Sequence, residues 1–144
     1  NHGWNIIETD ELIMKKYNDK LVNIVNKYGK GFMNIETSTI LSIKNIHNTV
    51  ISPGGSVVYS EEIMEHLKTL GVIIHLDTNV DDLINRITNY YERGIVMKKG
   101  DTLDTLYNER RPLYEKYREL SINNSDLNID ETVSIIMNCF HYLN

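Results

Sequence analysis

The chain contains no alanine, one cysteine and two prolines, and no long run of apolar residues. The single Cys139 cannot form an internal disulfide, which excludes a small disulfide-built domain and favours a reducing, cytoplasmic setting. The apolar stretches fall short of the about 20 residues needed to span a bilayer, and no charged stretch followed by an apolar one opens the chain as in a secretory signal. We therefore expect a cytoplasmic protein without a membrane partner.

The sequence also lacks a block of charge of one sign. Fifteen Lys and Arg residues against twenty Asp and Glu residues give a formal net charge of −5, and the basic residues are scattered. This pattern excludes an extended basic face and hence nucleic acid as a partner, but it leaves room for a local basic pocket that binds a small anion.

The composition is otherwise that of a globular protein. Hydrophobic residues make up 41% and charged residues 24% of 144 residues, enough for one compact domain and too few residues for two ordinary ones. Residues 1–144 are therefore predicted to form a single domain.

Short stretches with strand character alternate with amphipathic stretches of helical periodicity. The expected strands are 4–8, 49–51, 72–76 and 121–122, and the expected helices are 11–14, 21–28, 32–43, 61–70, 80–90, 102–120 and 130–143. Thr9 or Asp10 is predicted to cap the first helix, Val72–Leu76 reads as the most buried strand, and Pro112 is expected at a bend or a restart. This alternation predicts an α/β domain with three layers, in which helices cover both faces of a parallel sheet.

Ligands of such folds bind beyond the carboxyl ends of the strands. Glu8 and Asp10 lie at one such end, two residues apart, so that one carboxylate can face a metal or phosphate and the other a substrate hydroxyl. Helix capping is the simpler explanation, and the pattern alone favours it. The Gly54-Gly55 pair follows another strand and suits either close backbone approach of a ligand or merely a tight turn.

Two basic segments are further candidates. Arg110 and Arg111 suit a carboxylate or phosphate, although a solvated helix face is the default interpretation. Residues 92–101 form a positive, glycine-bearing stretch typical of a lid over phosphates or of an ordinary loop. The histidines show no metal-ligand spacing, and Cys139 lies among apolar neighbours, so metal and thiol chemistry find little support.

Taken in order, these segments resemble the shikimate kinase family over nearly the whole chain. Ile6–Ile13 is similar to the family's strand-to-helix D-T-D segment, Gly31–Glu36 to its G-F-R-x-x-E helix, and Val50–Val57 to the strand that leads into its triple-glycine loop. Asn108–Glu115 is the most specific match, because it closely resembles the signature N-E-R-x-P-L-Y.

The resemblance implies a P-loop kinase fold of the nucleoside-monophosphate kinase type. It also implies transfer of the ATP γ-phosphoryl group to a hydroxyl of shikimate or of a related hydroxy acid or polyol, with ATP and Mg²⁺ as cofactors. Such a protein is expected to bind a nucleotide and a small hydroxy acid and to act as a monomer.

The resemblance also implies a role for each matched residue. Asp10 would accept a hydrogen bond from the attacking hydroxyl and help to deprotonate it, while Glu8, which stands where the family has Asp, would hold water around Mg²⁺. Gly54 and Gly55 would contact the substrate through their backbone, and Arg110 would bind its carboxylate.

Three departures from the family pattern bear on the substrate. Arg93 would be the lid arginine, but Gly94-Ile95 replaces the usual Pro-Leu after it. Met33 stands where the family has an arginine that pairs with the substrate carboxylate, and Pro53 and Ser56 flank a glycine pair where the family has three glycines. These changes make an acceptor other than shikimate a live alternative.

The phosphate-loop pattern G-x-x-x-x-G-K-[ST] does not occur in the 144 residues, so no cofactor-binding residues can be assigned to the nucleotide. We expect this loop, with the central strand of the sheet, in roughly 30 residues upstream of Asn1. The alternative is a non-catalytic relative, complete as written, that keeps a small-anion pocket around Arg110 for sensing or partner binding.

Overall fold

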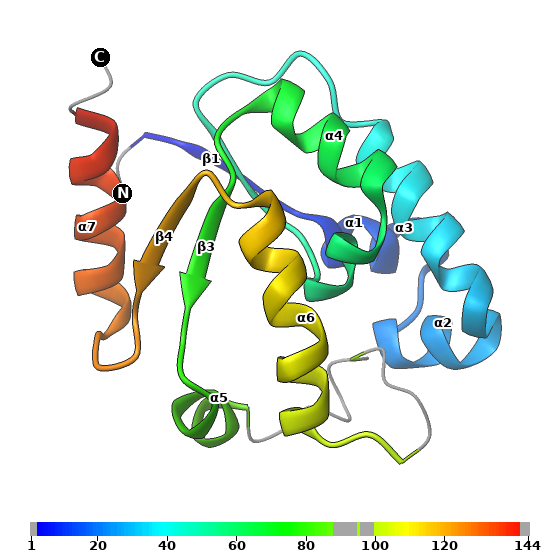
Figure 1. Cartoon of the computed structure of the whole chain (residues 1–144). Coiled ribbons are helices and arrows are strands. Elements are labelled where there is room, and N and C mark those ends of the chain that lie inside the picture. Colours follow the sequence, from blue (N-terminus) through cyan, green and yellow to red (C-terminus); the bar gives the residue numbers. More distant parts are fainter. Residues whose placement is uncertain (1–2, 88–94, 96–99, 142–144) are drawn as a thin grey trace. The chain divides into compact units, whose positions relative to one another are not determined.

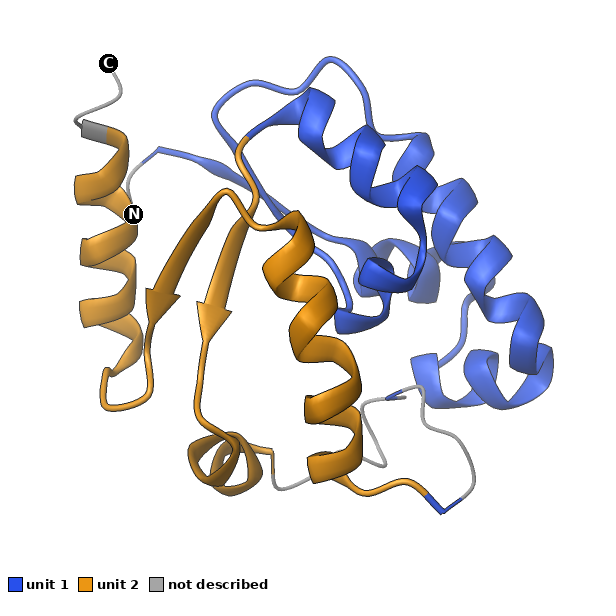
Figure 2. Cartoon of the chain, viewed as in Figure 1, with its two compact units in different colours: residues 1–71, 89–100 blue, residues 72–88, 101–144 orange. Residues whose placement is uncertain are grey.

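The computed structural model describes residues 3–87, 95 and 100–141, and they divide into two compact units. Unit 1 comprises residues 1–71 and 89–100, and unit 2 comprises residues 72–88 and 101–144 (Figure 2). The single domain expected for residues 1–144 stays a prediction.

In each unit, two strands alternate with helices, as expected (Figure 1). Unit 1 contains β1 (Asn5–Glu8), α1 (Thr9–Tyr17), α2 (Leu21–Tyr28), η1 (Gly29–Gly31), α3 (Phe32–Leu41), β2 (Thr49–Ser52), η2 (Gly55–Tyr59) and α4 (Glu61–Leu70). Unit 2 contains β3 (Ile74–Asp77), α5 (Val80–Arg86), α6 (Leu103–Tyr117), β4 (Leu120–Asn123) and α7 (Ile129–His141).

The strands of each unit pair in parallel. β1 pairs with β2 in a register that places Asn5 opposite Thr49, and β3 pairs with β4 with Ile74 opposite Leu120. Parallel neighbours need a crossover connection, which the helices between the paired strands provide. The prediction of an α/β fold with parallel strands is confirmed.

The apolar strand residues are less buried than their sequence suggests. Ile6 and Val50 lie opposite each other on adjacent strands and remain 70% and 48% exposed, and Val72 and Leu76 are also exposed. β3 still has the fewest exposed positions of the four described strands, so the strand predicted as the most buried is partly rather than fully buried. In each described pair, a strand has one hydrogen-bonded neighbour and its side chains alternate between two faces, so one set stays in contact with solvent.

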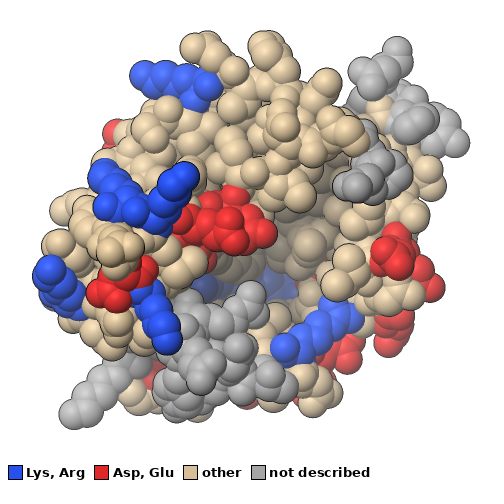
Figure 3. All heavy atoms as spheres, turned by 180° about the vertical axis from the view of Figure 1, so that it is seen from behind, with Lys and Arg blue, Asp and Glu red and all other residues tan. Residues whose placement is uncertain are grey.

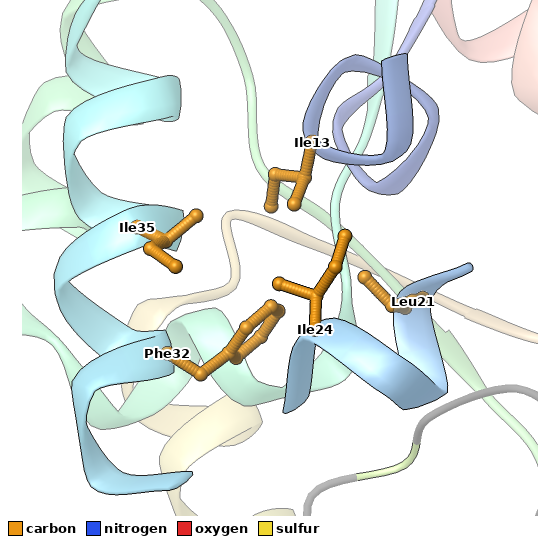
Figure 4. Close-up of a cluster of buried hydrophobic side chains, with 5 residues drawn as sticks. All are labelled: Ile13, Leu21, Ile24, Phe32 and Ile35. Carbon is orange, nitrogen blue, oxygen red and sulfur yellow. The ribbon is translucent and has the colours of Figure 1, made fainter. Parts of the chain in front are cut away.

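A hydrophobic cluster joins three helices of unit 1. It is formed by side chains from α1, α2 and α3, namely Ile13, Leu21, Ile24, Phe32 and Ile35 (Figure 4). The i, i+3 spacing within α2 and α3 places each pair on one helix face, so the three helices meet over the same core. Each of these side chains contributes about 1.5–3 kcal/mol when fully buried.

Several helix ends agree with the sequence and others do not. Ser60 caps α4, since its Oγ accepts a hydrogen bond from the backbone N–H of Ile63 at 3.3 Å, and Gly71 is its C-cap. The predicted cap of α1 by Thr9 or Asp10 is wrong, because both are already helical and Glu8 is the N-cap, without a side-chain capping bond. Thr9 already belongs to the first turn of α1, directly after β1. It therefore lacks the extended backbone that an N-cap residue has.

The other differences concern α5, α6 and the loop after β2. α5 ends at Arg86 rather than at Tyr90, and residues 88–90 lie outside the described residues. Helix α6 runs through Pro112 without a restart, and the loop after β2 winds into η2 at Gly55. A proline inside a helix removes one backbone hydrogen bond and costs about 3 kcal/mol or more, so other contacts of α6 must offset this cost.

Candidate functional site

The junction of β1 and α1 carries the predicted acidic pair. Glu8 is exposed at the end of the strand, and Asp10 is half-buried in the first helical turn. Glu8 lies opposite Ser52 in the parallel register, so the glycine loop that follows β2 starts beside these carboxylates. Because Glu8 makes no capping hydrogen bond, side-chain capping does not explain this residue.

Gly54 packs against two carboxylates. A Cβ atom at this position would lie 3.2 Å from Glu36 Oε1 and 3.3 Å from Asp10 Oδ1. The φ of Gly54 is −62°, a value open to any residue, so glycine is needed here for space rather than for backbone freedom. The structure thus brings Asp10 and Gly54 together, as predicted, and adds Glu36 to them.

Glu36 and Ser56 are residues of this site that sequence reasoning did not assign. Glu36 lies on α3 with only 1% of its surface exposed, and the Oγ of buried Ser56 donates to its carboxylate, 2.8 Å from Oε1 and 3.0 Å from Oε2. The sequence contained a signal for both residues. Glu36 is the last residue of the segment that resembles G-F-R-x-x-E, and Ser56 directly follows the glycine pair. Their contact joins positions 20 residues apart and becomes visible only in the fold.

In unit 2, the neighbouring residues Arg110 and Arg111 of α6 have different surroundings. Arg111 donates to both carboxylate oxygens of Asp77 at the end of β3, at 2.8 and 3.1 Å, and also to Glu115 and to the hydroxyl of Tyr107. The hydrogen bond and the charge of Asp77 raise the pKa of Arg111 further above its ordinary value. Arg111 is therefore engaged in holding α6 to β3.

Arg110 differs, because it is 8% exposed. The interpretation of this position as a solvated helix face is wrong. A buried guanidinium requires partners rich in acceptors, and the role of Arg110 in binding a substrate stays a prediction. Since Arg110 belongs to unit 2 and Asp10 and Gly54 to unit 1, a common site for the three residues remains a prediction.

His75 on β3 is a half-buried polar residue of unit 2. Its ring stacks on Tyr114, with the ring centroids 5.0 Å apart, and burial lowers the pKa of the imidazole. Its Nδ1 atom is buried and has no hydrogen-bond partner among the described residues. These surroundings favour the neutral ring and suit packing rather than proton transfer.

The remaining predicted site residues can be located only in part. Gly55 is exposed beside Gly54, whereas Arg93 and most of the predicted lid at 92–101 lie outside the described residues. On the face seen in Figure 3, Lys and Arg side chains lie in several separate places with Asp and Glu between them. The described residues therefore form no continuous basic surface on this face.

The carboxylates of the described residues limit the kind of metal site that this chain can form. Within residues 3–87, 95 and 100–141, no group of three or more His, Cys, Asp and Glu side chains could hold a metal ion alone. Mg²⁺ in phosphoryl-transfer enzymes usually takes one or two carboxylates and completes its shell with water and substrate phosphates. The exposed Glu8 and the nearby Asp10 fit that requirement, and the role of Glu8 stays a prediction.

Comparison with known proteins identifies the family of this chain. The family model for shikimate kinase matches residues 1–141. The chain belongs to the shikimate kinase family. The shikimate kinase of Macrococcus caseolyticus is 31% identical over 125 residues, which cover 86% of this chain and 74% of the relative. That of Thermoanaerobacter pseudethanolicus is 27% identical over 143 residues, covering 97% and 83%.

Solved structures of this family share the fold. A shikimate kinase from Acinetobacter baumannii in complex with shikimate matches with a TM-score of 0.82 and 22% identity, over 98% of this chain and 79% of that one. The enzyme from Aquifex aeolicus matches with a TM-score of 0.76 and 21% identity, over 97% and 83%. The family and the P-loop kinase fold predicted from the motifs are confirmed. None of the helices in the part that the structure describes is long and apolar enough to cross a membrane.

Proposed function

We propose that this protein is an ATP-dependent phosphotransferase that transfers the γ-phosphoryl group to a hydroxyl of shikimate or of a related hydroxy acid or polyol. The observation that carries the proposal is the Asp10 carboxylate, held against Gly54 at the carboxyl end of β1. A carboxylate fixed beside bare backbone can accept the proton of a hydroxyl that the loop positions.

Each residue of the proposed site has its own role in the reaction. Mg·ATP supplies the phosphoryl group when bound, and Glu8 would hold water around the metal. Asp10 orients the acceptor hydroxyl and takes its proton as the new oxygen–phosphorus bond forms, so the negative charge of the attacking oxygen need not build up in full. The backbone of Gly54 and Gly55 allows the acceptor to approach closely.

Two arginines complete the proposed site. Arg110 binds an anionic group of the acceptor with its planar fork, and Arg93 neutralises charge on the phosphoryl group in transfer. The relatives named above are shikimate kinases, and one solved neighbour holds shikimate, which supports a small hydroxylated acceptor. The non-catalytic alternative finds no support in these relatives.

Release of ADP tests the proposal directly. The protein, expressed from its complete reading frame, is mixed with Mg·ATP and shikimate or related polyols, and ADP is followed by a coupled assay. We expect acceptor-dependent release that disappears when Mg²⁺ is chelated. ADP release at the same rate with and without every acceptor would reject the proposal.

A further inference from the structure

We propose that Ser56 is a positioning residue of the phosphoryl transfer, because its hydroxyl fixes the glycine loop, Gly54 and Gly55, relative to the Asp10 carboxylate. This inference rests on the proposed function, in which Asp10 takes the proton of the acceptor hydroxyl. All the residues concerned lie in unit 1.

The glycine loop has few groups of its own with which to be held. Gly54 and Gly55 carry no side chains, and Pro53 before them has no backbone N–H to donate. Glycine also loses more conformational freedom than any other residue when its backbone is fixed. Ser56 is the first residue after the glycine pair whose side chain can donate a hydrogen bond.

The Ser56 hydroxyl donates to a carboxylate that itself touches the loop. Its Oγ lies 2.8 Å from Glu36 Oε1 and 3.0 Å from Oε2, and both residues are buried. The same Oε1 would lie 3.2 Å from a Cβ atom at Gly54. Hydrogen bonds to charged groups are stronger than those between neutral groups. This contact therefore ties the glycine loop to one side chain of α3.

Asp10 reaches the same glycine from α1. Its Oδ1 would lie 3.3 Å from the same Cβ atom. Helices α1 and α3 contribute Ile13 and Ile35 to one buried cluster, and Ile35 directly precedes Glu36. The two helices thus hold Asp10 and Glu36 at fixed places, and the Ser56 hydroxyl fixes the loop to them.

The position of the loop matters for the proton transfer. The acceptor hydroxyl must come within about 2.6–3.2 Å of its base, and in the proposed site the loop backbone places the acceptor. A misplacement of about 1 Å that arises away from the reacting atoms can lower a rate about 100-fold. Ser56 therefore acts on the rate through Glu36 and the loop, without touching the acceptor.

Single variants test the role of the hydroxyl. Ser56→Ala should lower kcat for acceptor-dependent ADP release about tenfold or more, whereas Ser56→Thr keeps the hydroxyl and should stay within about threefold of the wild type. Thr39→Val is the matched control, because it removes a buried hydroxyl of α3 that donates to the carbonyl of Ile35 at 2.8 Å. It should leave kcat within about twofold of the wild type.

A double-mutant cycle tests whether Ser56 acts through the placement of Asp10. In an Asp10→Asn background the base is absent, so Ser56→Ala should lower kcat by less than about twofold. All variants are assayed well below their melting temperatures. An equal loss of kcat in both backgrounds, or a loss for Thr39→Val as large as for Ser56→Ala, would give Ser56 a merely structural role and overturn the proposal.

The wild-type assay separates this failure from that of the proposed function. An active wild type whose kcat is unchanged in Ser56→Ala would overturn the inference alone. A wild type that releases no ADP with any acceptor would reject the proposed function, and the inference would fall with it.

Discussion

Arg110 and Arg111 are adjacent in sequence, yet their side chains have different surroundings. Arg111 reaches the carboxylate of Asp77, whereas Arg110 is nearly removed from solvent. Successive residues of a helix point about 100° apart, so neighbours in the sequence face different parts of the protein. The sequence motif alone does not explain why Arg110 and Arg111 differ. The structure shows that Arg111 pairs with Asp77, whereas Arg110 is buried.

The contrast between these arginines leads to a kinetic prediction. Arg110→Ala should raise KM for an anionic acceptor about 10- to 100-fold with a smaller change in kcat, since it removes charge-assisted hydrogen bonds. Arg111→Ala should instead lower the free energy of unfolding and leave KM within about threefold. Steady-state kinetics and urea denaturation of both variants measure the two effects, and unchanged kinetics for Arg110→Ala would remove it from the site.

Asp10 can be tested by changing one oxygen to nitrogen. Asp10→Asn keeps the size of the side chain but removes the proton acceptor, so kcat should fall about 10²- to 10⁴-fold while KM changes little. Asp19→Asn is the control, because this exposed carboxylate accepts hydrogen bonds from Lys20 and Asn23 within α1–α2. Equal activity of the two variants would exclude Asp10 as the base.

The close packing at Gly54 gives a steric prediction. Gly54→Ala would bring a methyl group to within 3.2–3.3 Å of two carboxylates, so the loop or the carboxylates must shift and kcat/KM should fall. We expect a loss of about tenfold or more, since small misplacements of reacting groups are costly. Gly71→Ala should retain activity, because its φ of 172° suits any residue and nothing lies within 4 Å of the new methyl group.

Among the elements, helices with a strong hydrophobic periodicity were predictable from the sequence. Features that depend on how neighbouring elements pack were not. The helices around Ile24 and Ile63 follow from local spacing, and the structure confirms them. The exposure of Val72 and Leu76 depends on what lies beside a strand, which its own residues do not encode. Likewise, the contact of Ser56 with Glu36 arises only when α3 packs beside the glycine loop.

β3 carries the one described histidine with a lowered pKa, and this gives a pH prediction. Burial lowers the pKa of His75 from its ordinary value of 6.5, so below that pH the unfolded chain binds the proton more readily than the folded one. Stability should therefore decrease as the pH falls from about 6.5 toward the folded pKa, and hold steady above.

His75→Phe keeps an aromatic ring against Tyr114 and removes the titrating group. Urea unfolding at pH 7.5 and 5.5 should show a smaller pH-dependent loss of stability for this variant than for the wild type. His47→Asn, at an exposed position, is the control and should keep the full loss. The same loss in His75→Phe would mean that other groups cause it.

For the whole molecule, the family and the fold could be predicted from the sequence, because the motifs follow one another along the chain in the order that the family has. The division into two units could not, since no linker or change of composition marks residues 71–72, 88–89 or 100–101, where the chain passes between units. Such a division depends on which segments contact one another, and each unit is assembled from two stretches of chain.

The parallel pairing of β3 with β4 also affects the order of events during synthesis. Ile74 pairs with Leu120, 46 residues later, so β3 leaves the ribosome well before its partner exists. At about 5–20 residues per second this delay lasts about 2–9 s. For that time the backbone N–H and C=O groups of β3 that later bond to β4 have no strand partner from this pair, so β3 can pair with the strands of other nascent chains during this interval.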